Sequence, residues 1–220
     1  VQQGLAALVD LPEWIEPSLL DRQKWPAWRE ALLLAHKGEH REAQRRGRAA
    51  GVLEVMRAED GTVTWLPVPD PLATSMPTWE QVPESSAFNG GEGVWYHGGR
   101  VFFTTKGDDR VWLHDVDAQT LEVLYDAADH AEPVLTGVDF VLVTEGGDVV
   151  VGEDGGDMQI VAIAPDGRIA PLVQVAGHDG SEITGIAFDP SLRRLLFSSQ
   201  RGPEGGSGRV SFMVEGPFFG

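Results

Sequence analysis

Residues 149–163 read VVVGEDGGDMQIVAI, and this stretch decides the fold class. Its two ends, residues 149–151 and 160–163, are runs of apolar and mostly β-branched residues, which favour buried strands. Between them lies Glu153-Asp154-Gly155-Gly156-Asp157, an acidic loop whose glycines permit tight turns. The stretch therefore predicts two adjacent strands joined by an acidic loop.

The same order repeats on either side of this stretch. Strands predicted at residues 138–143 and 169–175 complete a set of four, a matching set spans residues 94–124, and a third set at 186–212 lacks its last strand. The second strands of the three sets begin near Val101, Val149 and Leu195, which are 48 and 46 residues apart. Four strands in every 40–50 residues, roughly, predict the blades of a β-propeller, with unrelated hairpins of a sandwich as the alternative.

Two further elements are predicted before these sets, a hairpin and a helical segment. Residues 51–68 predict a hairpin with Asp60-Gly61 at its turn, matching the third and fourth strands of a further blade. The chain then holds about three and a half blades, below the usual minimum of four. We therefore expect missing propeller blades upstream of residue 1, or self-association. Residues 1–50 predict a helical N-terminal segment, because an amphipathic run follows Pro26, so the fold is mainly β with a partial β-propeller over residues 51–220.

Composition narrows the classes of function. The 220 residues include no Cys, which excludes disulfides, thiolate metal sites and a Cys nucleophile. No apolar run approaches the roughly 18 residues of a membrane span, and no signal peptide is visible in this chain. Residues 51–220 hold 9 Lys and Arg against 27 Asp and Glu, so we expect no nucleic acid and no membrane as partner.

Acidic residues take matching positions in the three sets. In a propeller, the loops before the first strands and those between the second and third strands open on one face. Five carboxylates at these positions or within a first strand are candidate metal ligands: Glu92, Asp139, Glu153, Asp154 and Glu182. Lys106 and Arg201 fall beside them as candidate substrate-binding residues, since metals and cations together suit a phosphoryl group. Carboxylates without His or Cys favour Ca²⁺ or Mg²⁺ over zinc, and the alternative is a solvated rim in which the acids only cap turns.

Several short motifs, in order along residues 50–220, resemble the C-terminal part of the PhoX-type alkaline phosphatase family. They are Phe88-Asn89-Gly90-Gly91-Glu92-Gly93-Val94, Phe103-Thr104-Thr105-Lys106-Gly107-Asp108, Glu153-Asp154-Gly155-Gly156, Ser181-Glu182-Ile183-Thr184-Gly185-Ile186-Ala187-Phe188-Asp189-Pro190, Phe197-Ser198-Ser199-Gln200-Arg201-Gly202 and Glu215-Gly216-Pro217-Phe218. The resemblance implies a secreted or periplasmic bacterial propeller that hydrolyses small phosphate esters with calcium and iron. It also implies that Glu92, Glu153 and Glu182 are metal ligands.

The chain departs from that family in several places. Asp139-Phe140 stands where members tend to carry Asp-Asn, the Cys that binds iron in characterised members has no counterpart, and the N-terminal blades are absent. Ca²⁺ is therefore the expected cofactor, and iron lacks its Cys ligand. Residues 11–36 instead resemble a short stretch of RecG-type helicases without a nucleotide-binding motif, so no helicase activity is inferred. A join between unrelated pieces near residues 48–51 would explain both observations.

Three functions from different classes follow. The leading one is a PhoX-like, metal-dependent phosphomonoesterase, which would be inactive as a fragment if the missing blades supply essential ligands. The alternatives are a calcium-dependent, lactonase-like propeller hydrolase and a non-catalytic propeller binding module. No catalytic residue is assigned: His178 and Ser181 are near neighbours in sequence, but contiguous residues seldom form a nucleophilic triad, and a loop is predicted there.

Overall fold

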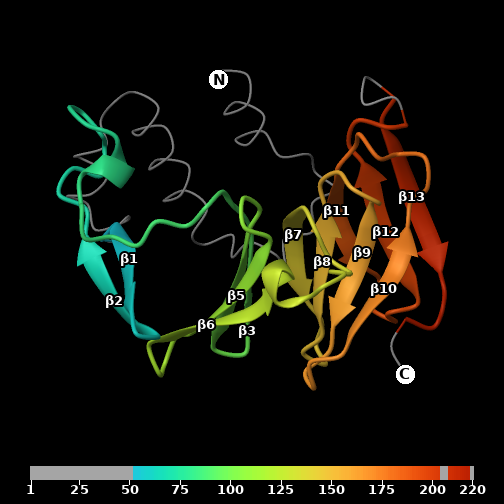
Figure 1. The fold of residues 1–220 in the computed structure, drawn as a ribbon, viewed down its shortest axis with the longest axis horizontal. Helices are drawn as coiled ribbons and strands as arrows, with labels where there is room; N and C mark the ends of the chain where they lie inside the picture. Colours follow the sequence, from blue (N-terminus) through green and yellow to red (C-terminus); the bar gives the residue numbers. More distant parts are fainter. Residues whose placement is uncertain (1–51, 204–207, 219–220) are drawn as a thin grey trace, which may run out of the picture. The chain divides into compact units, whose positions relative to one another are not determined.

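The computed structural model describes residues 52–203 and 208–218 (Figure 1). The chain divides into two compact units, Val1–Leu53 and Glu54–Gly220, and the described strands all belong to the second. The helical segment predicted over residues 1–50 lies outside the described residues. Within the described ranges, no helix has the length and apolar character needed to cross a membrane.

Three antiparallel sheets make up the described part of the second unit (Figure 1). The first sheet contains β1 (Glu54–Glu59), β2 (Thr62–Pro67), β3 (Gly91–His97), β4 (Arg100–Thr105), β5 (Arg110–Asp115) and β6 (Thr120–Asp126). The second contains β7 (Val138–Val143), β8 (Val149–Glu153), β9 (Gln159–Ile163) and β10 (Ile169–Gln174), and the third contains β11 (Ile183–Phe188), β12 (Arg194–Ser199) and β13 (Val210–Glu215). Two short 3₁₀ helices of the described part, η2 (Thr78–Glu80) and η3 (Ala127–Asp129), lie in connections. The predicted sets of four, four and three strands are confirmed, and the fold is a mainly β partial propeller.

The N-terminal hairpin is placed differently from our prediction. We expected it as the outer half of a further blade, but its strand β2 pairs with β6, so the first sheet has the order β1-β2-β6-β5-β4-β3. Two backbone hydrogen bonds join the hairpin to the start of β6, from Val63 N to Gln119 O at 2.7 Å and from Leu121 N to Gly61 O at 2.9 Å. The hairpin therefore widens the first blade, and the count of about three and a half blades becomes three sheets.

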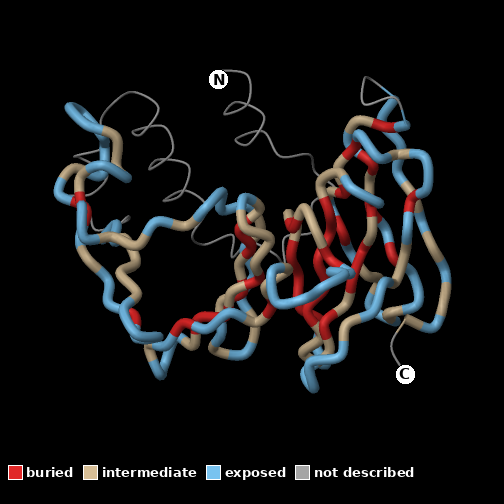
Figure 2. Tube along the Cα trace, viewed as in Figure 1, coloured by how far each residue is buried: buried red, intermediate tan, exposed pale blue. Residues whose placement is uncertain are grey.

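Strand β8 shows why the Val-rich stretch is buried on both faces. Val149 and Val151 belong to the apolar core shared with the first sheet, whereas Val150 belongs to the core shared with the third sheet. Successive side chains of a strand point to opposite faces, so a central strand between two cores is apolar throughout. Figure 2 shows the buried residues concentrated along this second sheet.

Two glycines allow neighbouring sheets to approach closely. A Cβ at Gly93 of β3 would lie 2.6 Å from the carbonyl oxygen of Asp139 and 2.7 Å from the amide of Val141, both on β7. A Cβ at Gly152 would lie 2.8 Å from Ile186 Cδ1 of the third sheet. A side chain at either position would force the sheets apart, so glycine is required where the inner strands meet.

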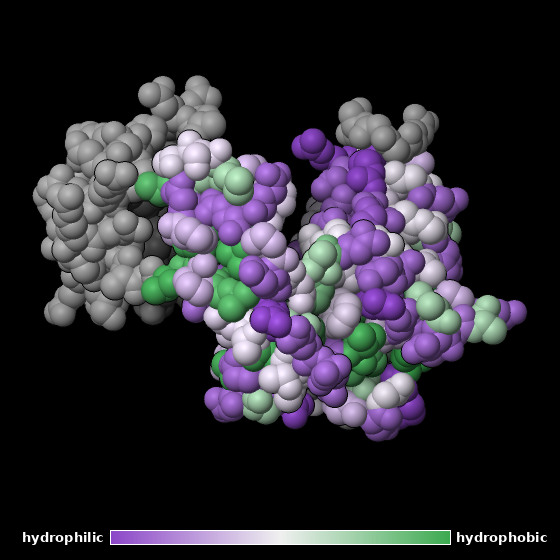
Figure 3. Space-filling model, turned by 60° about the vertical axis from the view of Figure 1, so that its left-hand side comes forward, coloured by the Kyte–Doolittle hydropathy of each residue, from purple (hydrophilic) through white to green (hydrophobic). Residues whose placement is uncertain are grey.

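The surface is mainly hydrophilic on the face drawn in Figure 3, where hydrophobic side chains gather only in small, separate patches. This fits the surplus of acidic residues in the chain, whose formal net charge is −17. Exposed apolar side chains scattered in this way are normal for a folded surface.

Candidate metal centre

Three carboxylates from different elements converge where the second and third sheets meet. Asp139 lies on β7, Asp154 follows β8, and Glu182 precedes β11. Each offers one oxygen, and these oxygens lie within 4.8 Å of one another. Oxygens bound to one Ca²⁺ each lie about 2.3–2.6 Å from it, so a separation of up to about 5 Å is compatible with a shared ion. We call Asp139, Asp154 and Glu182 the acidic triad.

The backbone holds each member of the triad. Thr104 donates its hydroxyl to the carbonyl oxygen of Asp139, and the amide of Asp154 donates to the carbonyl of Gly137 at 2.8 Å. Asp154 and Glu182 form an isolated antiparallel bridge between the second and third sheets. The triad is therefore fixed by the same contacts that join the sheets.

Two cations from neighbouring loops contact the triad. Lys106 Nζ, which follows β4, forms an ion pair with Asp154 Oδ2. Arg201, which lies beyond β12, pairs through Nη2 with Asp154 Oδ1 and through Nη1 with Glu182 Oε2 at 3.0 Å. Gln200 Nε2 also donates to Glu182 Oε1 at 3.3 Å. Both oxygens of Asp154, whose side chain is only 13% exposed, thus already have cationic partners.

The electrostatics of the triad are dominated by an excess of negative charge. Burial raises the pKa of Asp139 from 3.8 to about 6, and the charges of Glu182, Glu92 and Asp154 add to the increase, with Lys106 opposing it. The hydrogen bond to Asp154 raises the pKa of Lys106, against the effect of its partial burial. Three carboxylates and two cations leave the site short of positive charge, which a divalent cation could supply.

Glu92 lies at the exposed edge of the site. It belongs to β3 and is exposed, and it is not one of the three carboxylates whose oxygens lie within 4.8 Å. Its charge nevertheless contributes to the raised pKa values of both Asp139 and Lys106. Glu92 therefore acts on the triad through space.

Glu153, also expected as a metal ligand, has a different environment. It is fully buried, and its two oxygens accept backbone N–H groups, from Thr136 at 2.8 Å and from Gln159 at 2.7 Å. Burial raises its pKa from 4.5 to about 7, although these two hydrogen bonds act in the opposite direction. The structure does not bring Glu153 to the triad; its carboxyl group connects the segments before β7 and at the start of β9.

A polar network that the sequence did not predict supports Arg201. His178 Nδ1 and Ser199 Oγ lie 2.8 Å apart, and Ser199 donates to Ser181 Oγ at 2.7 Å. Ser181 Oγ accepts the amide of Arg201 at 2.9 Å, and both serines are fully buried. Buried hydroxyl groups require such partners. The predicted loop containing His178 and Ser181 thus has a structural role beside the triad. Ser199 lies on β12, distant in sequence from this loop, so no local pattern could have predicted its part in the network.

The fold and the site define a partial β-propeller with an acidic site between sheets. No protein-family model matches the chain, and no curated protein matches it.

Solved structures with a similar backbone include a gluconolactonase from Xanthomonas campestris, which is 16% identical, with 76% of this chain and 57% of that chain covered and a TM-score of 0.45. Another is a luciferin-regenerating enzyme, which is 18% identical, with 59% of this chain and 46% of that chain covered and a TM-score of 0.45. A third is a protein of unknown function from Bacteroides thetaiotaomicron, which is 18% identical, with 54% of this chain and 29% of that chain covered and a TM-score of 0.42. The chain thus spans less than half the length of the last two, and the propeller assignment follows from its own strand pairing.

Proposed function

We propose that the acidic triad binds a divalent cation, preferably Ca²⁺, and that the site hydrolyses a neutral ester of the lactone type. One observation carries the proposal: the oxygens of Asp139, Asp154 and Glu182 lie within 4.8 Å of one another, in a place where Lys106 and Arg201 offset their charge only in part. Oxygen ligands of this kind suit hard cations. When bound, such a cation would polarise an ester carbonyl as a Lewis acid.

The pairing of the two cations favours a neutral substrate over a phosphate ester. Lys106 and Arg201, which a phosphate would need as partners, are both engaged with Asp154, and Arg201 also with Glu182. A lactone carries no net charge and does not require either of them. The lactonase alternative is therefore better supported by these contacts than the phosphatase.

Each residue of the site has a role that follows from its contacts. Asp139, Asp154 and Glu182 would hold the cation. Lys106 and Arg201 keep Asp154 in position, since each of its oxygens has one of them as partner. Glu92, exposed at the edge, adds to the negative potential that attracts a cation.

A PhoX-type phosphomonoesterase remains the second candidate, and one observation favours it. A cation bound through one oxygen of Asp154 would leave the other oxygen with its cationic partner, whereas a cation that displaced both Lys106 and Arg201 would free them to bind a phosphoryl group. A secreted or periplasmic location belongs to this second proposal. Iron belongs to this second proposal only through the family resemblance, and the Cys that would bind it has no counterpart in this chain.

The first test separates cation binding from catalysis. Isothermal titration with CaCl₂ is expected to give binding to the full chain that is at least about tenfold weaker in Asp154→Asn. Glu145→Gln, an exposed residue of the turn between β7 and β8, is the matched control and should bind as the unchanged protein does. Absence of Ca²⁺ binding would refute the metal site itself.

The second test identifies the reaction. Hydrolysis of glucono-1,5-lactone above its spontaneous rate, present with Ca²⁺ and lost with a chelator or in Asp154→Asn, is the expected result. Hydrolysis of p-nitrophenyl phosphate under the same conditions would favour the second candidate instead. Ca²⁺ binding without turnover of either substrate would overturn the enzyme proposal and leave a cation-binding module.

A further inference from the structure

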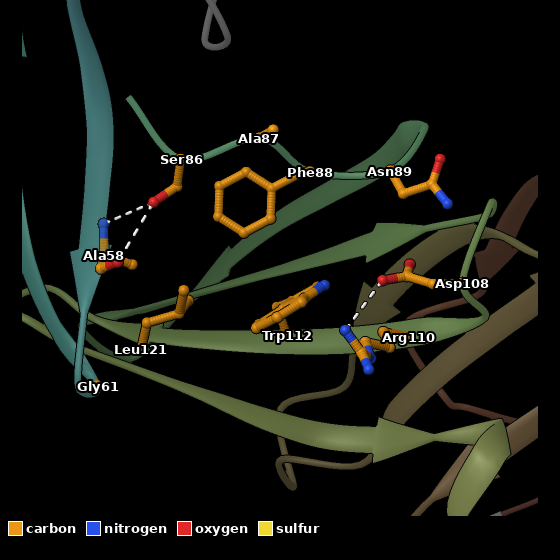
Figure 4. A pocket seen from close by; sticks show the side chains of 10 residues that line it. All are labelled: Ala58, Gly61, Ser86, Ala87, Phe88, Asn89, Asp108, Arg110, Trp112 and Leu121. Atoms are coloured by element: carbon orange, nitrogen blue, oxygen red, sulfur yellow. Dashed lines mark hydrogen bonds and ion pairs between the residues drawn. The ribbon is translucent and has the colours of Figure 1, made fainter. Parts of the chain in front are cut away.

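A cavity of about 330 Å³ lies on the first sheet between the N-terminal hairpin, the segment before β3 and strand β5 (Figure 4). None of its lining residues belongs to the acidic triad. Its size falls at the lower end of the range of small-molecule pockets, which is roughly 300–1,000 Å³.

One part of the cavity is apolar and aromatic. Phe88, Trp112 and Leu121 line it, and Phe88 packs edge-to-face on Trp112 with ring centroids 5.4 Å apart. The indole N–H of Trp112 already donates to Thr105 Oγ1 at 2.9 Å. The aromatic wall therefore has no free hydrogen-bonding group of its own, and its indole borders the polar end, because the Arg110 guanidinium lies over the Trp112 ring with Cζ 5.7 Å from the centroid.

The other end is polar, and its groups are held in place. Arg110 pairs through Nη1 with Asp108 at 3.1 Å and through Nε with Asp126 at 2.6 Å. Asn89 is held against Gly107, where an added Cβ would lie 2.4 Å from Asn89 Oδ1. Figure 4 shows Asn89, Asp108 and Arg110 together at one end of the cavity, beyond the two aromatic rings.

Two hydrogen-bonding groups at this end lack a protein partner. Within residues 52–203 and 208–218, neither the Asn89 side-chain amide nor Arg110 Nη2 takes part in a hydrogen bond. Both are therefore available to a ligand, and together they offer donors from Asn89 and Arg110 and an acceptor from Asn89.

The charges at the polar end select against ionic ligands. The Arg110 guanidinium is already paired with two carboxylates, those of Asp108 and Asp126, so an anion would meet repulsion from both acids. A cation would find both carboxylates already engaged, because Asp108 accepts from Thr105 and Arg110, and Asp126 from Ala128 and Arg110. A planar aromatic ligand also fits poorly, because Phe88 and Trp112 touch each other with ring planes at 83° and leave no parallel slot between them.

We propose that this cavity binds one neutral sugar ring. A sugar ring has an apolar C–H face, which matches Phe88, Trp112 and Leu121, and an edge of hydroxyl groups, which matches Asn89 and Arg110. The site is separate from the acidic triad and does not depend on the proposed hydrolase activity.

Binding to the full chain tests this proposal. Methyl glycosides of glucose, galactose and mannose are titrated by saturation-transfer NMR, beside gluconate, glucosamine and adenosine. At least one neutral glycoside should bind in the millimolar range, at least about tenfold more weakly in Asn89→Ala and Trp112→Leu. Trp79→Ala, an exposed aromatic residue outside the cavity, and Asp154→Asn should leave the affinity unchanged.

Three results would contradict sugar binding in this cavity. The proposal is overturned if no neutral glycoside binds at about 50 mM, if a charged sugar or adenosine binds more tightly, or if Asn89→Ala binds as before. Should Trp112→Leu fail to fold, Gly107→Ala replaces it, because its methyl group displaces the Asn89 side chain and should weaken binding to a similar degree.

Discussion

Glu153 and Asp154 are neighbours in the chain, yet they belong to different environments. Glu153 is fully buried and accepts two backbone N–H groups, whereas Asp154 pairs with the side chains Lys106 and Arg201 at a partly open site. Backbone partners cannot leave without unfolding, but side-chain partners can exchange for a ligand. The comparison separates a carboxylate that maintains the fold from one that is available for binding.

The largest effect is expected from Glu153→Leu. This change leaves the N–H groups of Thr136 and Gln159, both half-buried residues, facing the fully buried site of Glu153 without an acceptor, and should lower the free energy of unfolding by about 3 kcal/mol. Urea unfolding followed by fluorescence measures it. Glu153→Gln, which keeps an acceptor oxygen, should cost clearly less, and a loss of less than about 1 kcal/mol in Glu153→Leu would contradict the structural role.

Asp154→Asn should change the stability little and the Ca²⁺ affinity strongly. Its partners Lys106 and Arg201 are about one third exposed, so the free energy of unfolding should change by no more than about 1 kcal/mol. Ca²⁺ affinity should fall at least about tenfold. Asp166→Asn, an exposed acid paired with Arg168, is the matched control. A strongly destabilised Asp154→Asn protein would remove the distinction between the two neighbours.

Stability should fall as the pH rises from about 4 towards 7. At a pH between its ordinary pKa of 3.8 and its folded pKa of about 6, Asp139 binds more protons in the folded state than in the unfolded one. The same holds for Glu153 between its ordinary pKa of 4.5 and its folded pKa of about 7. Rising pH therefore removes folded-state stability. Ca²⁺ should restore the part due to Asp139 alone.

Thermal unfolding between pH 4.5 and 7.5, with and without Ca²⁺, measures this effect. Asp139→Asn should flatten the pH dependence and abolish the Ca²⁺-dependent gain, whereas Glu153→Gln should flatten it and retain the gain. An unaltered slope in Asp139→Asn would count against the raised pKa of this group.

The smallest effect is expected from Glu92→Gln. Because Glu92 is exposed and acts through space, its loss should lower the pKa of Asp139 slightly and weaken Ca²⁺ binding by about two- to threefold. The difference should disappear at high salt, since exposed charges are screened. Titration of Ca²⁺ at low and high ionic strength checks this, and a tenfold loss that persists in salt would make Glu92 a direct ligand instead.

Strand periodicity predicted most of the sheet order and the convergence of Asp139, Asp154 and Glu182 with Lys106 and Arg201. It could also have separated Glu153 from Asp154, because successive residues at a strand end point to opposite sides. We assigned both residues to the same acidic loop instead, and the family resemblance also favoured Glu153 as a ligand. The hairpin was misplaced because its link to β6 consists of backbone hydrogen bonds, which leave no trace in side-chain type. The sugar-site residue Asn89 lies in a segment without regular period.

The short loop between β4 and β5 has a consequence for how this protein tolerates substitution. Lys106 reaches the acidic triad, Asp108 lines the cavity on the first sheet, and Asp109 Oδ1 accepts the amide of Val138 at the start of β7. Three residues of one short loop thus contact the acidic triad, the cavity and the neighbouring sheet. Changes in this loop should therefore be strongly epistatic, and insertions there should be selected against even where those in the exposed turn at Glu145 are accepted.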